Sequence, residues 1–161
     1  MDTVALKARI NTILPSVDVD KGLRLSVNNM KNYKKALYCA LKSIRFKLPL
    51  LDSMIDTGEY GGLRVIIHTL CQLLSTIGAD SMAERGYALE CTVLNADPSV
   101  LQEETINYRN ELAYLMDALE QTIRMMDSFP DTPSQLHRCY TPEQTRELLK
   151  ESFPARSKKI S

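Results

Sequence analysis

Helical periodicity over almost the whole chain is the feature that most restricts how this sequence can fold. Apolar residues recur at steps of three, four and seven, as they do along one face of an α-helix. No stretch alternates apolar and polar residues for long, and the 161 residues include only six glycines. The pattern therefore predicts an all-α fold and leaves little sequence for strands.

Proline, glycine and capping residues divide this pattern into separate helices. The predicted helices cover residues 2–13, 19–27, 29–48, 60–77, 80–94 and 98–128. Pro49 is expected to end the third of them, because proline lacks the N–H that continues a helix. Segment 50–57 is then either a short helix or the same helix continued after a kink. Asp97 followed by Pro98 is a strong start signal for the last of these helices.

The core is expected to be an up-and-down helical bundle built mainly from residues 30–127. Residues 1–128 then form one domain, with an extra helical segment at the N-terminal end. The remaining residues, 129–161, are expected to form a C-terminal loop, a short helix at 142–152 and a disordered, basic tail. The apolar stripes are accounted for by a single bundle, so a monomer is expected.

Composition excludes several classes of function. Lysine plus arginine equals aspartate plus glutamate at 20 each, so the basic excess of a typical nucleic-acid-binding protein is missing. No apolar run approaches the 18 or so residues that a membrane span needs. Charges interrupt the N-terminal segment, which makes it a poor signal peptide. We therefore expect a cytoplasmic protein that binds neither nucleic acid nor membrane.

The cysteines point to no metal or redox motif. They are Cys39, Cys71, Cys91 and Cys139. The spacings of 32, 20 and 48 residues contain no Cys-x-x-Cys pair, which zinc sites and redox motifs require. Reduced thiols and no bound metal are expected.

His68 is the residue most suggestive of chemistry. The predicted helix 60–77 gathers its apolar side chains in one sector, namely Leu63, Ile66, Ile67, Leu70, Leu73, Leu74 and Ile77. His68 points nearly opposite to this sector. The outward surface around it is shared by Arg64, Cys71, Gln72 and Ser75. Position alone would favour a surface histidine with no task, and His137, the other histidine, has no motif around it.

Four short matches in the right order add a family resemblance. They are His68-Thr69-Leu70, the small-residue run Ser75–Ala79, Ala88-Leu89-Glu90, and the upstream segment Val17–Leu23, whose match ends with Tyr33 in the following helix. Together they resemble the signature of histidine phosphotransfer (HPt) domains. The resemblance covers about residues 17–127. It implies a four-helix bundle of HPt type, to which the two terminal segments are additions.

The resemblance also implies a function. His68 matches the phosphoacceptor, and Glu90 matches a polar residue that orients the imidazole by a hydrogen bond. Such a protein is a phosphocarrier and not an enzyme. It relays a phosphoryl group in a two-component phosphorelay, from a sensor histidine kinase or its receiver domain to a response regulator. It needs no cofactor of its own, because the receiver domain brings the magnesium ion and the acceptor aspartate.

Two positions depart from the family pattern. Cys71 stands where the family usually has a lysine, and Gln72 stands where it usually has a glycine. Arg64 lies one turn before His68, so its guanidinium could contact the phosphate instead. The expected partner-binding surface consists of Arg64, Thr69, Cys71, Gln72 and Ser75.

The departures leave other interpretations open. A degenerate HPt-like docking module would bind a receiver, or another helical partner, without carrying phosphate. An unrelated helical protein would require all the matches to be accidental. Cys71 and His68, three residues apart, could in principle form a nucleophile pair. The sequence supplies no oxyanion hole or substrate pocket for that chemistry, so a thiol enzyme is disfavoured.

Overall fold

The computed structural model of the protein describes residues 3–128, and these form six helices and no strand. The helices are α1 (Thr3–Ile13), α2 (Val19–Leu25), α3 (Met30–Thr57), α4 (Leu63–Thr76), α5 (Asp80–Asn95) and α6 (Pro98–Asp127). The predicted all-helical fold is confirmed over this range. The loop, short helix and tail predicted for 129–161 lie outside the described residues.

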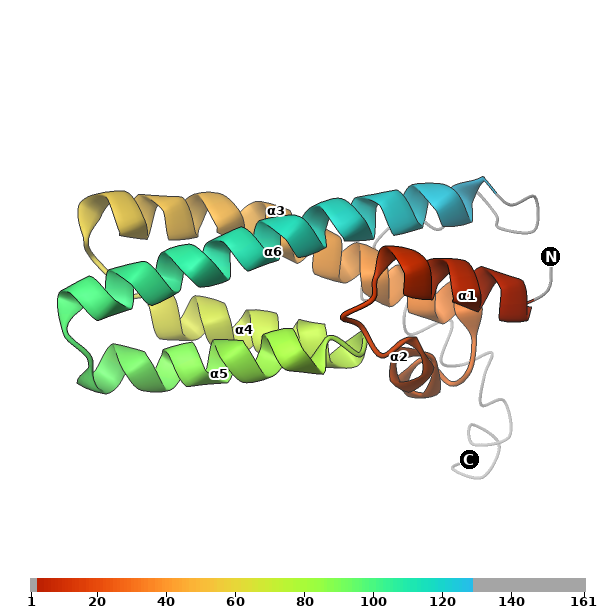
Figure 1. Ribbon diagram of the computed structural model, residues 1–161, viewed down its shortest axis with the longest axis horizontal. Coiled ribbons are helices and arrows are strands. Elements are labelled where there is room, and N and C mark those ends of the chain that lie inside the picture. The colour runs from red at the N-terminus through yellow and green to blue at the C-terminus, as the bar shows by residue number, and fades with distance from the viewer. Residues whose placement is uncertain (1–2, 129–161) are drawn as a thin grey trace, which may run out of the picture.

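Helix length determines how the bundle is assembled. The 28 residues of α3 and the 30 of α6 make helices of about 42 and 45 Å at 1.5 Å per residue. The 14 and 16 residues of α4 and α5 give about half that length. Figure 1 shows α3 beside α6 and α4 beside α5, with the chain reversing direction at each step. The long pair extends beyond the short pair, and α1 and α2 lie against this overhang.

Helix α3 runs through Pro49, so the prediction that it ends at residue 48 is wrong and the alternative of a continued helix is right. Pro49 lies on the exposed face of α3, where water can bond to the carbonyl left without an N–H. Leu48 and Leu51 on either side of it are buried. Burial of this apolar face against the bundle outweighs the cost of the lost hydrogen bond.

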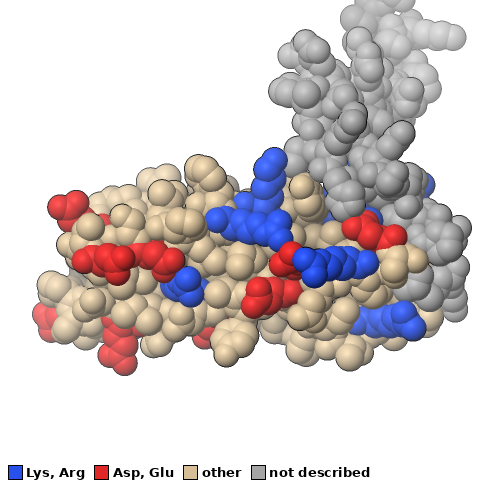
Figure 2. All heavy atoms as spheres, turned by 90° about the horizontal axis from the view of Figure 1, so that it is seen from above, with Lys and Arg blue, Asp and Glu red and all other residues tan. Residues whose placement is uncertain are grey.

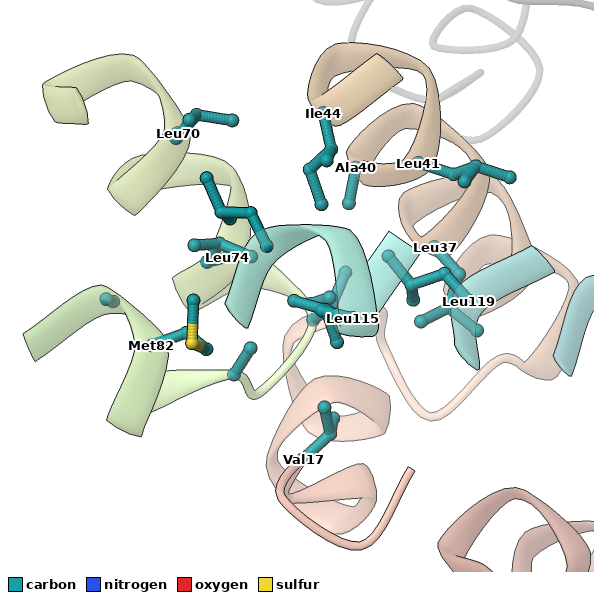
Figure 3. Close-up of a cluster of buried hydrophobic side chains, with 14 of the residues drawn as sticks. Val17, Leu37, Ala40, Leu41, Ile44, Leu70, Leu74, Met82, Leu115 and Leu119 are labelled. Atoms are coloured by element: carbon teal, nitrogen blue, oxygen red, sulfur yellow. The ribbon is translucent and has the colours of Figure 1, made fainter. Parts of the chain in front are cut away.

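The buried core forms where the apolar stripes of the two long helices predict it. The stripe of α3 is buried as expected, with Tyr33, Leu37, Ala40, Leu41, Ile44 and Leu48 inside. The stripe of α6 is buried too, at Leu101, Tyr108, Leu112, Leu115, Leu119, Ile123 and Met126. Figure 3 shows side chains from both stripes turned toward Leu70, Leu74 and Met82 of the short helices. One continuous core therefore holds the short pair against the long pair.

A joint between α2, α3 and the end of α4 fixes one end of the short pair. The Asp18 N–H donates to the Gly78 carbonyl at 2.9 Å, and the Tyr33 hydroxyl donates to the Ile77 carbonyl at 2.9 Å. Gly22 of α2 packs directly against the Tyr33 ring, and a Cβ added to this glycine would lie 2.3 Å from a ring carbon. Two carbonyls just after α4 are thus bonded, one by Asp18 before α2 and the other by Tyr33 of α3.

Charged residues of both signs are interspersed on the face formed by α3 and α6 (Figure 2). Arg109 of α6 holds Asp52 of α3 through two nitrogens, at 2.7 and 3.2 Å. Lys34 is almost fully buried and pairs with Asp127 across the same two helices. Within residues 3–128, no helix combines the length and the apolar character needed to cross a bilayer.

Candidate functional site

His68 projects into solvent from the middle of α4. Its side chain is 55% exposed, so the predicted exposure is confirmed. The opposite side of the helix is held in the core by Leu63, Ile67, Leu70, Cys71 and Leu74. An imidazole on a helix anchored in this way has a fixed position while remaining open to a partner.

The buried side of α4 is rotated relative to the predicted one. Ile66 and Leu73 are only half-buried, whereas Cys71 is fully buried. The prediction that Cys71 faces outward beside His68 is therefore wrong. The reason is the packing of α5: the Cys71 thiol reaches the Ala83 carbonyl at 3.3 Å, and Gly86 leaves room for it. A Cβ on Gly86 would lie 2.3 Å from that sulfur.

Burial removes Cys71 from the partner-binding surface and from any nucleophile pair with His68. Desolvation raises the pKa of the Cys71 thiol to about 11; a hydrogen bond with Tyr108 lowers it, and the nearby Glu90 charge raises it further. A buried protonated thiol is a poor nucleophile. Among residues 3–128, no group of three or more histidine, cysteine, aspartate or glutamate side chains could hold a metal ion.

The burial of Cys71 predicts that alkylation of the thiols is selective. At pH 8 a pKa of about 11 leaves about one thiol in a thousand as thiolate. In the native protein iodoacetamide should therefore modify the exposed Cys91 and spare Cys71. Reaction at Cys71 should rise with pH until about 11, and it should become fast at pH 8 once urea unfolds the chain. Peptide mapping by mass spectrometry would measure this, and equal native rates at both cysteines would contradict the burial.

Glu90 of α5 lies within ion-pair distance of the imidazole. Its Oε1 lies 3.2 Å from His68 Nδ1, and the glutamate side chain is only 16% exposed. Oε1 is a buried acceptor that receives no well-formed hydrogen bond from residues 3–128. A ring orientation that directs the His68 Nδ1–H to this oxygen would satisfy the carboxylate.

The carboxylate determines how the two ring nitrogens differ. A carboxylate only accepts hydrogen bonds, so it favours the tautomer with the proton on Nδ1. The lone pair is then on Nε2, and the side-chain nitrogen of Gln72 lies 3.4 Å from it. Neutral imidazole in this state has one nitrogen held and the other available as a nucleophile.

The other predicted surface residues differ in their suitability for contact. Arg64 and Thr69 are exposed and line an open hollow together with Val65, His68 and Glu90. The Thr69 hydroxyl donates to the Val65 carbonyl at 2.9 Å, so its hydrogen bond is local. Ser75 is half-buried and lies two turns beyond His68.

Sequence reasoning missed an apolar rim around this hollow. The ring of Tyr87 meets the His68 ring edge-on, with centroids 6.2 Å apart and planes at 66°. Val65, which lines the hollow, and Leu94, one turn after Glu90 on α5, are 72% and 61% exposed. Tyr87 lies three residues before Glu90, and this spacing could have placed it on the same face of α5.

No family model, curated protein or solved structure matches this chain.

Proposed function

We propose that this chain is a histidine phosphotransfer protein with an HPt-type four-helix bundle formed by α3 to α6. It acts as a monomer in the cytoplasm and carries a phosphoryl group on His68. One observation supports the proposal most: an exposed imidazole has Nδ1 3.2 Å from the largely buried carboxylate of Glu90, and Nε2 on the side of the exposed Gln72 side chain. This is the arrangement that a rigid, reusable phosphoacceptor requires.

The chemistry follows from this arrangement. The Nε2 lone pair attacks the phosphorus of an aspartyl phosphate on a receiver domain. A P–N bond forms, the P–O bond breaks, and its electron pair returns to the aspartate of the partner. The ring gains positive charge in the process, and the Glu90 carboxylate beside Nδ1 stabilises that charge. The magnesium ion belongs to the receiver, and the reverse reaction discharges His68.

The surroundings of His68 fit a transient protein partner. Val65, Tyr87 and Leu94 supply apolar contact area around a polar centre, a composition typical of small signalling interfaces. Cys71 is buried and a thiol carries no positive charge, so it cannot replace the lysine that the family usually has at this position. Arg64, exposed at the hollow, is the cation that we assign to the phosphoryl group.

Transfer from phosphorylated receiver domains tests the proposal. Receivers labelled with radioactive acetyl phosphate, including the receiver domains of hybrid kinases, are mixed with the chain and separated from it. The chain should acquire an acid-labile, base-stable label and should return it to a fresh receiver. A folded chain that binds a receiver but takes no label would instead be the docking module. A chain that neither binds nor takes label would overturn both.

A further inference from the structure

The most informative departure in the site is Gln72, which lies one turn after His68 on the exposed face of α4. Its amide nitrogen is 3.4 Å from His68 Nε2, and both side chains are exposed. With Nδ1 facing the Glu90 carboxylate, Nε2 carries the lone pair and the amide N–H is the donor. The separation exceeds that of a normal hydrogen bond, so the contact is weak and easily broken.

The contact engages the electron pair that must form the P–N bond. An amide N–H on Nε2 lowers the availability of that pair, and the Gln72 side chain must turn away before phosphorus can approach. Glutamine can do so because it rotates about several bonds and is exposed here. Gln72 should therefore slow the loading of His68 modestly without blocking it.

After transfer the same amide has a different acceptor. The phosphoryl oxygens then lie beside Nε2, where the Gln72 N–H can donate to them. Loss of the phosphoryl group to water passes through a loose transition state in which the P–N bond breaks and the oxygens lose negative charge. A donor on these oxygens stabilises the phosphohistidine more than that transition state. Its presence should therefore lengthen the lifetime of the phosphohistidine.

We infer that Gln72 is a switching donor, bonded to Nε2 before transfer and to the phosphoryl oxygens after it, which slows both the loading and the spontaneous hydrolysis of His68. The inference rests on the proposed function, because it gives the amide a role in the phosphorylated state. It also assigns a task to a residue that occupies the place of the family's glycine.

The test loads the protein without any receiver. Potassium phosphoramidate transfers its phosphoryl group to the imidazole: a P–N bond forms at the ring and ammonia leaves. Phosphorus NMR then follows both loading and decay. Gln72→Met retains the length of the side chain and removes its donor, so it should load faster and decay faster than wild type. We expect about two- to tenfold for each rate, as for one weak hydrogen bond.

Two further variants complete the experiment. Gln102→Met, at an exposed glutamine on α6, should leave both rates unchanged. Gln72→Ala should resemble Gln72→Met if the N–H donor is responsible. A Gln72→Met protein with wild-type rates would overturn the inference. A phosphohistidine that lives long in Gln72→Met and briefly in Gln72→Ala would also overturn it, because this pattern would indicate steric shielding by the side chain.

The experiment distinguishes a failure of the Gln72 inference from a failure of the proposed function. Loaded wild-type protein that no receiver discharges would overturn the proposed function while the measured rates still decide the role of Gln72. Wild-type protein that phosphoramidate fails to load at His68 would overturn the inference itself, because Nε2 would then not be an accessible nucleophile.

Discussion

Replacing His68 with glutamine should abolish phosphoryl acceptance and leave the fold unchanged. Glutamine has no nitrogen lone pair that can attack phosphorus, whereas neutral imidazole has one. The His68 side chain is 55% exposed, so its loss should alter the free energy of unfolding by about 0.5 kcal/mol or less. Label transfer from a phosphorylated receiver would show the loss of acceptance. Circular dichroism and urea unfolding of the same variant would show that the fold is unchanged.

The second histidine provides a matched control. His137→Gln makes the same chemical change at a position outside the described residues, and it should retain full labelling. Label that persists in His68→Gln, or disappears in His137→Gln, would contradict the assignment of the phosphoacceptor.

A graded variant tests the carboxylate. Glu90→Ala should slow labelling about ten- to hundredfold, because a hydrogen bond to a charged group contributes about 1.5–3 kcal/mol. Glu84→Ala removes an exposed glutamate from the same helix and should have little effect. Similar rates in the two variants would show that Glu90 does not orient the ring.

Replacing Gly78 with alanine should destabilise the protein severely. Gly78 has φ +87°, and a Cβ there would lie 2.0 Å from the Asp18 carbonyl oxygen, which belongs to the backbone and cannot easily move away. Backbone strain and steric overlap together should cost about 2–6 kcal/mol. This is a large fraction of the roughly 5–15 kcal/mol that stabilises a typical domain.

A substitution at Gly58 separates backbone strain from steric overlap. It has a similar φ of +72°, but a Cβ there would meet nothing within 4 Å. Gly58→Ala should therefore cost only the backbone strain, about 1–2 kcal/mol. Urea unfolding of both variants measures the difference. Equal losses would mean that the joint between residues 17–23 and the end of α4 does not form as described.

Periodicity predicted the long helices well because their apolar stripes are narrow. The stripe from Leu101 to Met126 identifies one buried face of α6, and that face is buried. The end of α3 was predicted wrongly at Pro49, because a local rule about proline does not include the burial of Leu48 and Leu51 on either side of it. The outcome depended on tertiary packing, which the local sequence does not contain.

Helix α4 shows why the site could be predicted only in part. Its apolar residues form one sector with two edges, and periodicity alone could not tell which edge meets α5. His68 lies far from either edge and was placed correctly. Cys71 lies at the edge that meets α5, and its burial was not predicted. Gly86, whose missing side chain leaves room for the Cys71 sulfur, belongs to another helix and gives no signal about α4.

If His68 is the phosphocarrier, its Nε2 atom accepts the phosphoryl group while Glu90 holds Nδ1. The most direct measurement is an NMR spectrum of the imidazole nitrogens of ¹⁵N-labelled protein after phosphorylation by a receiver. We predict phosphorus–nitrogen coupling at Nε2 of His68 and a proton on Nδ1. Phosphorus on Nδ1, on another residue or nowhere in the chain would contradict the claim.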